Sequence, residues 1–225
     1  MRAGAELRSL LSTAAPLFCF EMGLSTCYAI VASLSAQFSV ASTAAFQALW
    51  NPTSVLGFAT YPLKQAAQVF LPPMLAGPDQ TVGGAPKSRE FLKVLASLAS
   101  VCGVVLSTSV LALASRPSLF TPDAGIHPLI TSFGPLAAVG LLAVGFAQVL
   151  EGVLLGTGDL TFLSWSQLGN VLASVSTFAL ARVAGLGVHG AWLVFIALVI
   201  SRLVQGAVRV FVQRRPWDAA VAPIR

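Results

Sequence analysis

Glu21 is the residue of this sequence with the clearest potential for chemistry. It is the one charged residue between positions 9 and 63, and its neighbours Phe20 and Met22 are apolar. An ionised group at the centre of a bilayer costs about 2.5–3.5 kcal/mol on insertion scales, so its retention there indicates a function. Because burial disfavours the charged form, Glu21 is predicted to exchange a proton or a cation, as an ion-coupled transporter requires. The alternative is a structural role, with a protonated carboxyl group or an ion pair to Lys64 that joins two helices.

We predict a membrane helix over residues 43–71 that carries several polar side chains and is interrupted by two prolines. Asn51-Pro52 lies in its middle and Pro62 follows ten residues later, and each proline frees a backbone carbonyl one turn earlier. Freed carbonyls in lipid usually face protein or a wet cavity, and interrupted helices are typical of transporter binding sites. Pro52 and Pro62 are therefore predicted to break the helix and to act in gating, with an ordinary proline kink as the alternative.

Two further acids, Glu151 and Asp159, flank a tight turn that contains Gly156 and Gly158. We predict that this turn lies at the membrane interface, where an acidic side chain costs little. Asp159 is expected to cap the helix that follows, and Arg202 is expected to snorkel toward a helix end.

Signatures of an enzyme or a metal site do not accompany these residues. Three cysteines lie inside apolar stretches without a C-x-x-C pair, so neither zinc binding nor a disulfide framework is indicated. The stretch Gly23-Leu24-Ser25-Thr26 is a poor match to the motif of an intramembrane serine protease. Without a nucleophile–base pair, the sequence predicts no catalysis, no metal and no bound cofactor.

Composition indicates the environment in which these side chains work. The chain has 225 residues, of which 56% are hydrophobic and 9% charged, and its mean hydropathy is +0.83. Soluble domains carry about 25% charged residues, so a soluble enzyme of standard build is excluded, as is a disordered chain. The net charge of +5 comes without a dense basic run, which disfavours nucleic-acid binding. The composition predicts a multi-pass protein of the lipid bilayer.

Stretches without charge predict six transmembrane helices, since a bilayer-crossing helix needs about 20 mostly apolar residues. Turn residues separate them, among them Gly77-Pro78-Asp79 and Gly83-Gly84-Ala85-Pro86. The predicted domains are an N-terminal segment 1–9, a transmembrane lobe 10–212 and a C-terminal tail 213–225. The predicted helices cover residues 10–36, 43–71, 91–115, 128–152, 159–181 and 187–211.

Basic residues predict the orientation in the membrane. With a cytoplasmic N-terminus, the outer side holds only Arg116 and Arg182. Both termini are therefore predicted to lie in the cytoplasm or the plastid stroma, and the sequence leaves the plasma membrane and the plastid envelope open. The inner side then holds Arg2, Arg8, Lys87, Arg89, Lys93, Arg209, Arg214, Arg215 and Arg225.

Several stretches resemble those of a known transporter family. They are STAAFQ at 42–47 with QAAQVFLP at 65–72, LEGVLLGTGDL at 150–160, and GLGVHGAWL at 185–193. In this order and spacing they resemble the C-terminal half of the multidrug and toxic compound extrusion (MATE) family, in its DinF-like branch. The resemblance runs from about Leu7 to Arg215.

The resemblance implies an all-α fold and a transport function. The chain would be one six-helix lobe of a secondary-active antiporter that exports organic or xenobiotic solutes in exchange for H⁺ or Na⁺. Glu21 falls where many members carry a carboxylate in the first helix of this half, and Gln47, Asn51 and Gln68 would line the solute path. The acid that some members carry in the fourth helix has no evident counterpart, because the region near Val144 is apolar.

The length of the chain, about half of that family's, leaves three explanations open. The chain is a fragment, a short isoform, or a half that pairs with a complementary N-terminal lobe or a second copy; residues 1–9 would be the remnant of the linker between lobes. A non-transporting structural half-protein is an alternative. An aquaporin-like channel is a remote one, because Asn51-Pro52-Thr53 resembles one of the two Asn-Pro-Ala boxes that such channels need and no second Asn-Pro is present.

Overall fold

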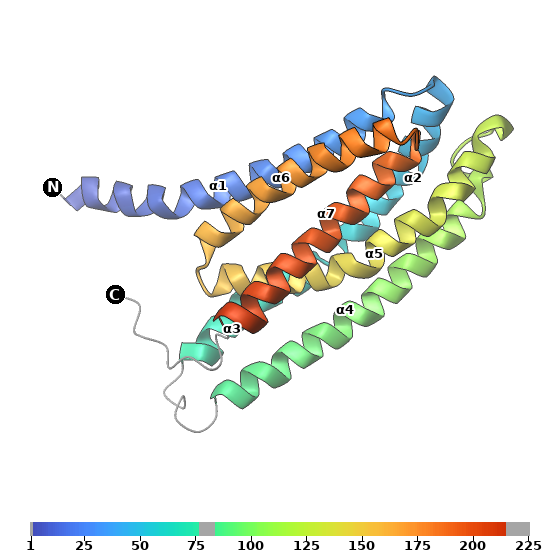
Figure 1. Cartoon of the computed structure of the whole chain (residues 1–225). Coiled ribbons are helices and arrows are strands. Elements are labelled where there is room, and N and C mark those ends of the chain that lie inside the picture. The colour runs from blue at the N-terminus through green and yellow to red at the C-terminus, as the bar shows by residue number, and fades with distance from the viewer. Residues whose placement is uncertain (1, 77–83, 215–225) are drawn as a thin grey trace.

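The fold is a bundle of helices in a computed structural model that describes residues 2–76 and 84–214. Every element of these residues is helical, which confirms the predicted all-α class (Figure 1). The predicted turn at Gly77-Pro78-Asp79 and residues 215–225 of the predicted tail lie outside the described residues. The elements are α1 (Arg2–Ser35), α2 (Val40–Phe58), α3 (Tyr61–Ala76), α4 (Gly84–Ala114), η2 (Pro117–Leu119), η3 (Ala124–Ile126), α5 (His127–Gly156), α6 (Leu160–Val183), α7 (His189–Ala207) and η4 (Val208–Arg214).

Each of the six predicted spans corresponds to a helix or a pair of helices. Four helical stretches, led by α1, α4, α5 and α7, are long and apolar enough to cross a membrane on their own. Two boundaries differ from the prediction. Helix α1 already begins at Arg2, so residues 2–9 continue the first helix instead of forming a separate segment. Helix α4 begins at Gly84, where a loop was expected through Pro86, because proline is tolerated in the first turn of a helix.

The predicted second span is divided next to one of the two prolines, Pro62, and not at the other. Helix α2 continues through Pro52 without a break, contrary to the prediction. The interruption lies at Ala59 and Thr60, directly before Pro62, which occupies the first turn of α3. A proline in a first turn removes an N–H group that has no intrahelical partner, whereas the carbonyl of Gly57 accepts a hydrogen bond from the Thr60 hydroxyl. The helix is therefore interrupted between α2 and α3.

Helix α5 is the centre of the bundle. It packs against α2, α3, α4 and α7, and 72% of its membrane-length window is buried. Helices α1 and α6 lie side by side on one flank, and α7 connects this pair to α5 (Figure 1). Two glycines of α5, Gly152 and Gly156, meet the backbone of α3 at Lys64 and Gln68. Small residues of this kind let two membrane helices approach closely.

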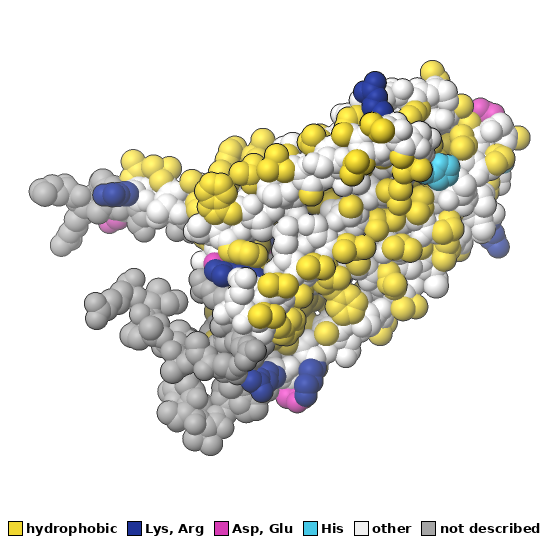
Figure 2. All heavy atoms as spheres, in the orientation of Figure 1, with side chains coloured by type: hydrophobic (Ala, Val, Ile, Leu, Met, Phe, Trp, Pro, Cys, Tyr) yellow, Lys and Arg dark blue, Asp and Glu magenta, His cyan; other side chains and the backbone are white. Residues whose placement is uncertain are grey.

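Charged residues gather at the two ends of the bundle, whereas hydrophobic side chains cover much of the visible face between them (Figure 2). The start of α1, the start of α4, the α5–α6 turn and η4 share one end (Figure 1). This end carries most of the described basic residues, and the other end carries Arg116 and Arg182. The chain is an integral membrane protein with a polar asymmetry along its bundle axis.

The close contact between α3 and α5 makes a test of the packing. Replacing Gly152 with alanine places a Cβ atom against the carbonyl oxygen of Lys64 and the side chain of Ala67. We expect a destabilisation of about 1–3 kcal/mol, because the two backbones have to move apart. The control is Gly169→Ala on α6, where an added Cβ meets nothing within 4 Å. Thermal unfolding in detergent should show a lower midpoint for the first variant only; equal midpoints would contradict the tight α3–α5 contact.

Candidate functional site

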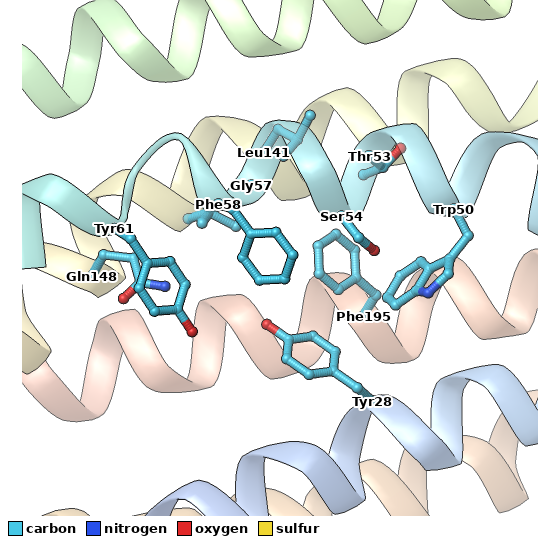
Figure 3. Close-up of a pocket in the computed structure, with 11 residues that line it drawn as sticks. Tyr28, Trp50, Thr53, Ser54, Gly57, Phe58, Tyr61, Leu141, Gln148 and Phe195 are labelled. Carbon is cyan, nitrogen blue, oxygen red and sulfur yellow. The ribbon is translucent and has the colours of Figure 1, made fainter.

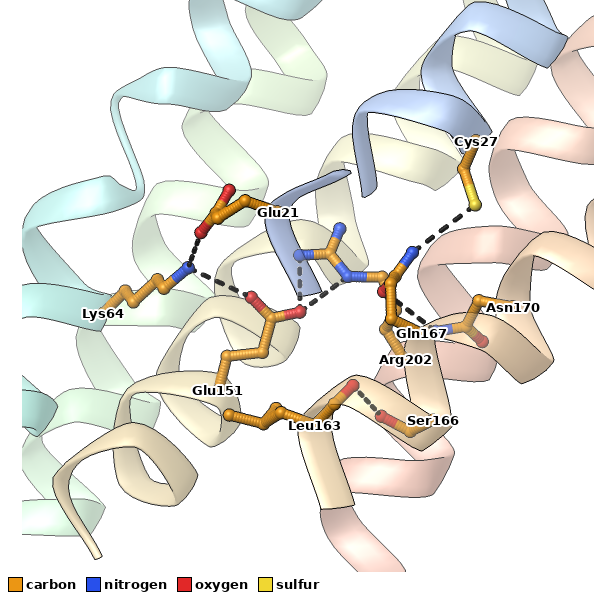
Figure 4. Close-up of polar contacts among 9 residues, drawn as sticks. All are labelled: Glu21, Cys27, Lys64, Glu151, Leu163, Ser166, Gln167, Asn170 and Arg202. Carbon is orange, nitrogen blue, oxygen red and sulfur yellow. Dashed lines mark hydrogen bonds and ion pairs between the residues drawn. The ribbon is translucent and has the colours of Figure 1, made fainter. Parts of the chain in front are cut away.

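A network of four charges crosses the interior of the bundle (Figure 4). Lys64 of α3 extends its Nζ to within 3.7 Å of Glu21 Oε1 on α1 and 3.5 Å of Glu151 Oε2 on α5. Glu151 Oε1 in turn accepts a hydrogen bond of 2.6 Å from Arg202 Nε on α7, and Arg202 Nη2 lies 2.6 Å from the same oxygen. We call these four residues the charge network. Two acids and two bases balance, so the network carries no formal net charge when all four groups are ionised.

The structure buries Glu151 and Arg202 among the helices of the bundle, with side chains that are 6% and 3% exposed. Arg202 therefore pairs inside the lobe instead of snorkelling, whereas the position of Glu151 near the membrane interface stays a prediction. Lys64 is 7% exposed. Ionised groups are tolerated in such surroundings only when opposite charges compensate them, and each of these groups has an oppositely charged partner. The pairing joins residues on different helices, so neither sequence position reveals it alone.

Glu21 is the open member of the charge network. Its side chain is 58% exposed in this lobe, although it was predicted to lie deep in apolar surroundings. Its ion pair to Lys64 matches the structural alternative that the sequence left open. The Lys64 ammonium group lies 5.1 Å from the ring centroid of the buried Phe20, so an aromatic face also stabilises this cation. Glu21 is therefore the member of the charge network that is accessible from outside the lobe.

Asp159 does not cap α6 as predicted. It stands directly before the helix, yet its side chain makes no capping hydrogen bond. Its carboxylate accepts two bonds from Arg209 of η4, at 2.7 and 3.3 Å, and that guanidinium lies 4.9 Å from the ring of Phe162. The preceding turn uses Gly158 with a φ of 71°, a conformation that favours glycine. The ion pair between Asp159 and Arg209 therefore holds η4 against the start of α6 at the end of the bundle.

A second polar group, which the sequence analysis missed, joins α1, α6 and α7. Asn170 of α6 accepts from Ser201 at 2.7 Å and from Gln205 at 3.0 Å, both on α7. The same asparagine donates to Gln167, which donates to Cys27 of α1 at 3.4 Å. Polar residues spaced three and four apart on otherwise apolar helices were the available signal. This group lies beside the charge network, since Gln167, Asn170 and Arg202 line one small cavity.

An aromatic pocket of about 220 Å³ opens between α1, α2, α5 and α7 (Figure 3). Small-molecule sites are mostly apolar, with a few polar groups that fix orientation, and this pocket has that character. Its polar groups come from Thr53, Ser54 and Gln148 in addition to two tyrosine hydroxyls. We use the name aromatic pocket for the space whose ring-bearing walls are Tyr28, Trp50, Phe58, Tyr61 and Phe195.

The residues predicted to line the solute path do not line this pocket. Gln47 is half-buried, and Asn51 and Gln68 are exposed. Helix α2 is the expected helix, but the residues it offers to the pocket include Trp50 and Ser54 instead. The recurrence of 50, 53, 54 and 57 along one helix face was the signal that could have identified it. In the described range, no cluster of three or more His, Cys, Asp or Glu side chains is placed to hold a metal ion.

Comparison with known proteins gives the following likenesses. No protein-family model matches the chain. It is 28% identical over 196 residues to Protein DETOXIFICATION 47, chloroplastic, of Arabidopsis thaliana, covering 85% of this chain and 35% of that relative. The chain thus spans about a third of the length of this curated relative.

Solved structures resemble the bundle more completely. One is a multidrug resistance MATE family transporter of the MOP superfamily in an outward-facing conformation, with a TM-score of 0.72 and 16% identity. The match covers 95% of this chain and 48% of that one. Another is a MOP superfamily transporter from Pyrococcus furiosus, with a TM-score of 0.72, 15% identity, and coverage of 94% and 47%.

Proposed function

We propose that this chain, which has the fold of one six-helix half of a MATE-type transporter, forms one lobe of an ion-coupled exporter of organic solutes. The observation that carries the proposal is the charge network, whose one exposed member is a carboxylate. Lys64, Glu151 and Arg202 are buried and together carry one net positive charge, which the accessible carboxylate of Glu21 balances. This arrangement suits a carboxylate that exchanges an ion with water while the ion pairs of the three buried groups change.

The exchange at Glu21 alters a contact between two helices. While Glu21 is ionised, Lys64 is held between Glu21 and Glu151 and thereby ties α1 to α3. A proton or Na⁺ on Glu21 cancels its charge, and Lys64 then has Glu151 as its remaining acidic partner. The tie between α1 and α3 loosens, and the interruption at Ala59 and Thr60 lets α3 move relative to α2. Ion binding is thus converted into a change in helix packing.

The aromatic pocket is the proposed solute site of this lobe. Its walls come from α1, α2, α5 and α7, together with Tyr61 of α3. These include every helix that carries a member of the charge network. A movement of α1 against α3 therefore reshapes the pocket. Its apolar rings and few polar groups suit amphipathic organic molecules.

A partner lobe completes the proposed exporter. The solved MATE-type chains are about twice as long as the part that this chain matches. Glu21, Asn51 and Gln68 are exposed, and polar groups that face lipid are costly. We infer that this polar surface faces a complementary N-terminal lobe or a second copy. We also infer, from the basic residues, that the end with the α1 start faces the cytoplasm or stroma of a plasma or plastid membrane.

Transport in vesicles tests the proposal. The chain is expressed with its partner lobe, reconstituted into phospholipid vesicles, and loaded with ethidium as a fluorescent organic solute. An imposed H⁺ or Na⁺ gradient should accelerate ethidium efflux, and dissipating the gradient should remove the acceleration. Efflux that ignores both gradients would leave the chain as a non-transporting half-protein and overturn the proposal.

Filling the aromatic pocket should block the solute without removing the ion site. Gly57 borders the pocket, and the nearest atom to an added Cβ is a Leu141 methyl carbon at 3.8 Å. In Gly57→Leu we expect solute binding to weaken by about tenfold or more, because the new side chain and the solute compete for one space. Gly169→Leu on the open face of α6 is the matched control. Equal ethidium binding by both variants in a fluorescence titration would argue against this pocket.

A further inference from the structure

Two tyrosines of the aromatic pocket stand on the same helix faces as members of the charge network. Tyr28 follows Glu21 by two helical turns on α1, and Tyr61 precedes Lys64 by one turn on α3. Residues at these spacings lie on one face of a helix. Both tyrosines line the pocket, so each helix presents a ring to the solute site and a charge to the network.

Contacts hold the two tyrosines in this intermediate position. On the pocket side, the Tyr28 ring lies 6.1 Å from Trp50, and the Tyr61 ring lies 5.6 Å from Phe58. On the network side, Lys64 Nζ is 5.7 Å from the Tyr61 ring centroid. Figure 3 shows the two hydroxyl groups pointing toward one another at the edge of the pocket.

The composition of the pocket wall gives these hydroxyls their importance. Among the described residues that line the pocket, none carries a formal charge. A solute there can therefore respond to the charge network only through neutral groups or through movement of the wall. A tyrosine hydroxyl both donates and accepts, so it can exchange a hydrogen bond with the network for one with a solute.

We propose that Tyr28 and Tyr61 are positioning residues that couple the aromatic pocket to the charge network. This inference rests on the proposed function. When Glu21 is ionised, Lys64 and Arg202 share two carboxylates; when Glu21 is neutral, both cations depend on Glu151. The ring of Tyr61, which lies against Lys64, then shifts, and Tyr28, whose hydroxyl points toward that of Tyr61, shifts with it. Coupling is reciprocal, so a solute that engages the hydroxyls shifts the ionisation of the network.

The pH dependence of solute binding measures this coupling. The charged groups facing the two tyrosines are Glu21 on α1, Lys64 on α3, Glu151 on α5 and Arg202 on α7, whereas the lining residues of α2 are neutral. The full chain with its partner lobe, in phospholipid nanodiscs, is titrated with 2-naphthol, a neutral ring that carries one hydroxyl. Between about pH 3.5 and about pH 7, a range that spans the ordinary titration of a carboxyl group, we expect its affinity to change by on the order of tenfold.

Phenylalanine variants separate coupling from simple pocket contact. In Tyr28→Phe/Tyr61→Phe the rings remain but the hydroxyls are lost, and we expect the pH-dependent change to fall below about twofold. Each single variant, which perturbs packing less, should show an intermediate dependence. The control Phe58→Leu keeps both hydroxyls, so its affinity should fall equally at every pH. A double variant that retains the full pH dependence, or an unmodified chain that shows none, would overturn the inference.

A Glu21→Gln variant distinguishes this inference from the proposed function. If it removes the pH dependence while the double tyrosine variant keeps it, Glu21 carries the ion and the tyrosines do not couple it. If the tyrosine variant removes the dependence while Glu21→Gln keeps it, the coupling stands and another group of the network binds the ion.

Discussion

Replacing Glu151 with glutamine is expected to destabilise the lobe by about 3–5 kcal/mol, because it leaves buried cations without their main partner. Glu151 pairs with Arg202 at 2.6 Å and with Lys64 at 3.5 Å, and all three side chains are less than a tenth exposed. In Glu151→Gln the two cations have only Glu21, which reaches Lys64 from the exposed side. Thermal unfolding and the fraction recovered as monodisperse protein in detergent measure the loss.

Two further variants identify burial as the cause. Glu90→Gln removes an acid that pairs with Lys93 at 3.1 Å, but both side chains are more than 70% exposed. Such surface pairs contribute about 0–1 kcal/mol, so this variant should unfold at nearly the unchanged temperature. The double variant Glu151→Leu/Arg202→Met removes one charge of each sign and should recover most of the loss. A Glu151→Gln chain as stable as Glu90→Gln would contradict the compensating role of the network.

The helices could be predicted from the sequence because a lipid bilayer restricts the backbone structures that can cross it. Charge-free stretches of membrane length had to be helices, since the bilayer offers no other partner for backbone groups. The prediction failed at Pro52 because a proline is compatible with a continuous membrane helix when its surroundings satisfy the freed carbonyl. The first helix begins at Arg2 and not at residue 10, because a rule based on the length of the apolar stretch does not fix where the helix starts in the residues before it.

The site was harder to predict, and the reason is also physical. Glu21 was identifiable because a lone acid stands out among apolar residues. The Glu151–Arg202 pair was not, because 51 positions separate its members and no local pattern links the two. The residues that α2 offers to the aromatic pocket were not identified, because the lipid-facing and protein-facing sides of a membrane helix are both apolar and periodicity does not orient the helix. Asn51 is exposed, whereas Trp50 lines the pocket.

Replacing Glu21 with glutamine should separate transport from stability, in contrast to the Glu151 variant. The side chain is 58% exposed and its Lys64 partner lies at 3.7 Å, so its pair contributes about 0–1 kcal/mol to stability. Glutamine keeps the shape of the side chain but can neither take up a proton nor balance a cation. We therefore expect gradient-driven ethidium efflux to fall by on the order of ten- to a hundredfold, while membrane insertion and the unfolding midpoint are nearly unchanged.

The control for this experiment is again Glu90→Gln. Its carboxylate is exposed and pairs with Lys93, and it makes no ion pair with the charge network. It should export ethidium at the rate of the unmodified protein under the same gradient. Efflux from Glu21→Gln at the unmodified rate from about pH 6 to about pH 8 would remove Glu21 from the coupling step. The ion would then have to act on Glu151, and because that carboxylate is 6% exposed, a path for water to the centre of the bundle would have to open during each transport cycle.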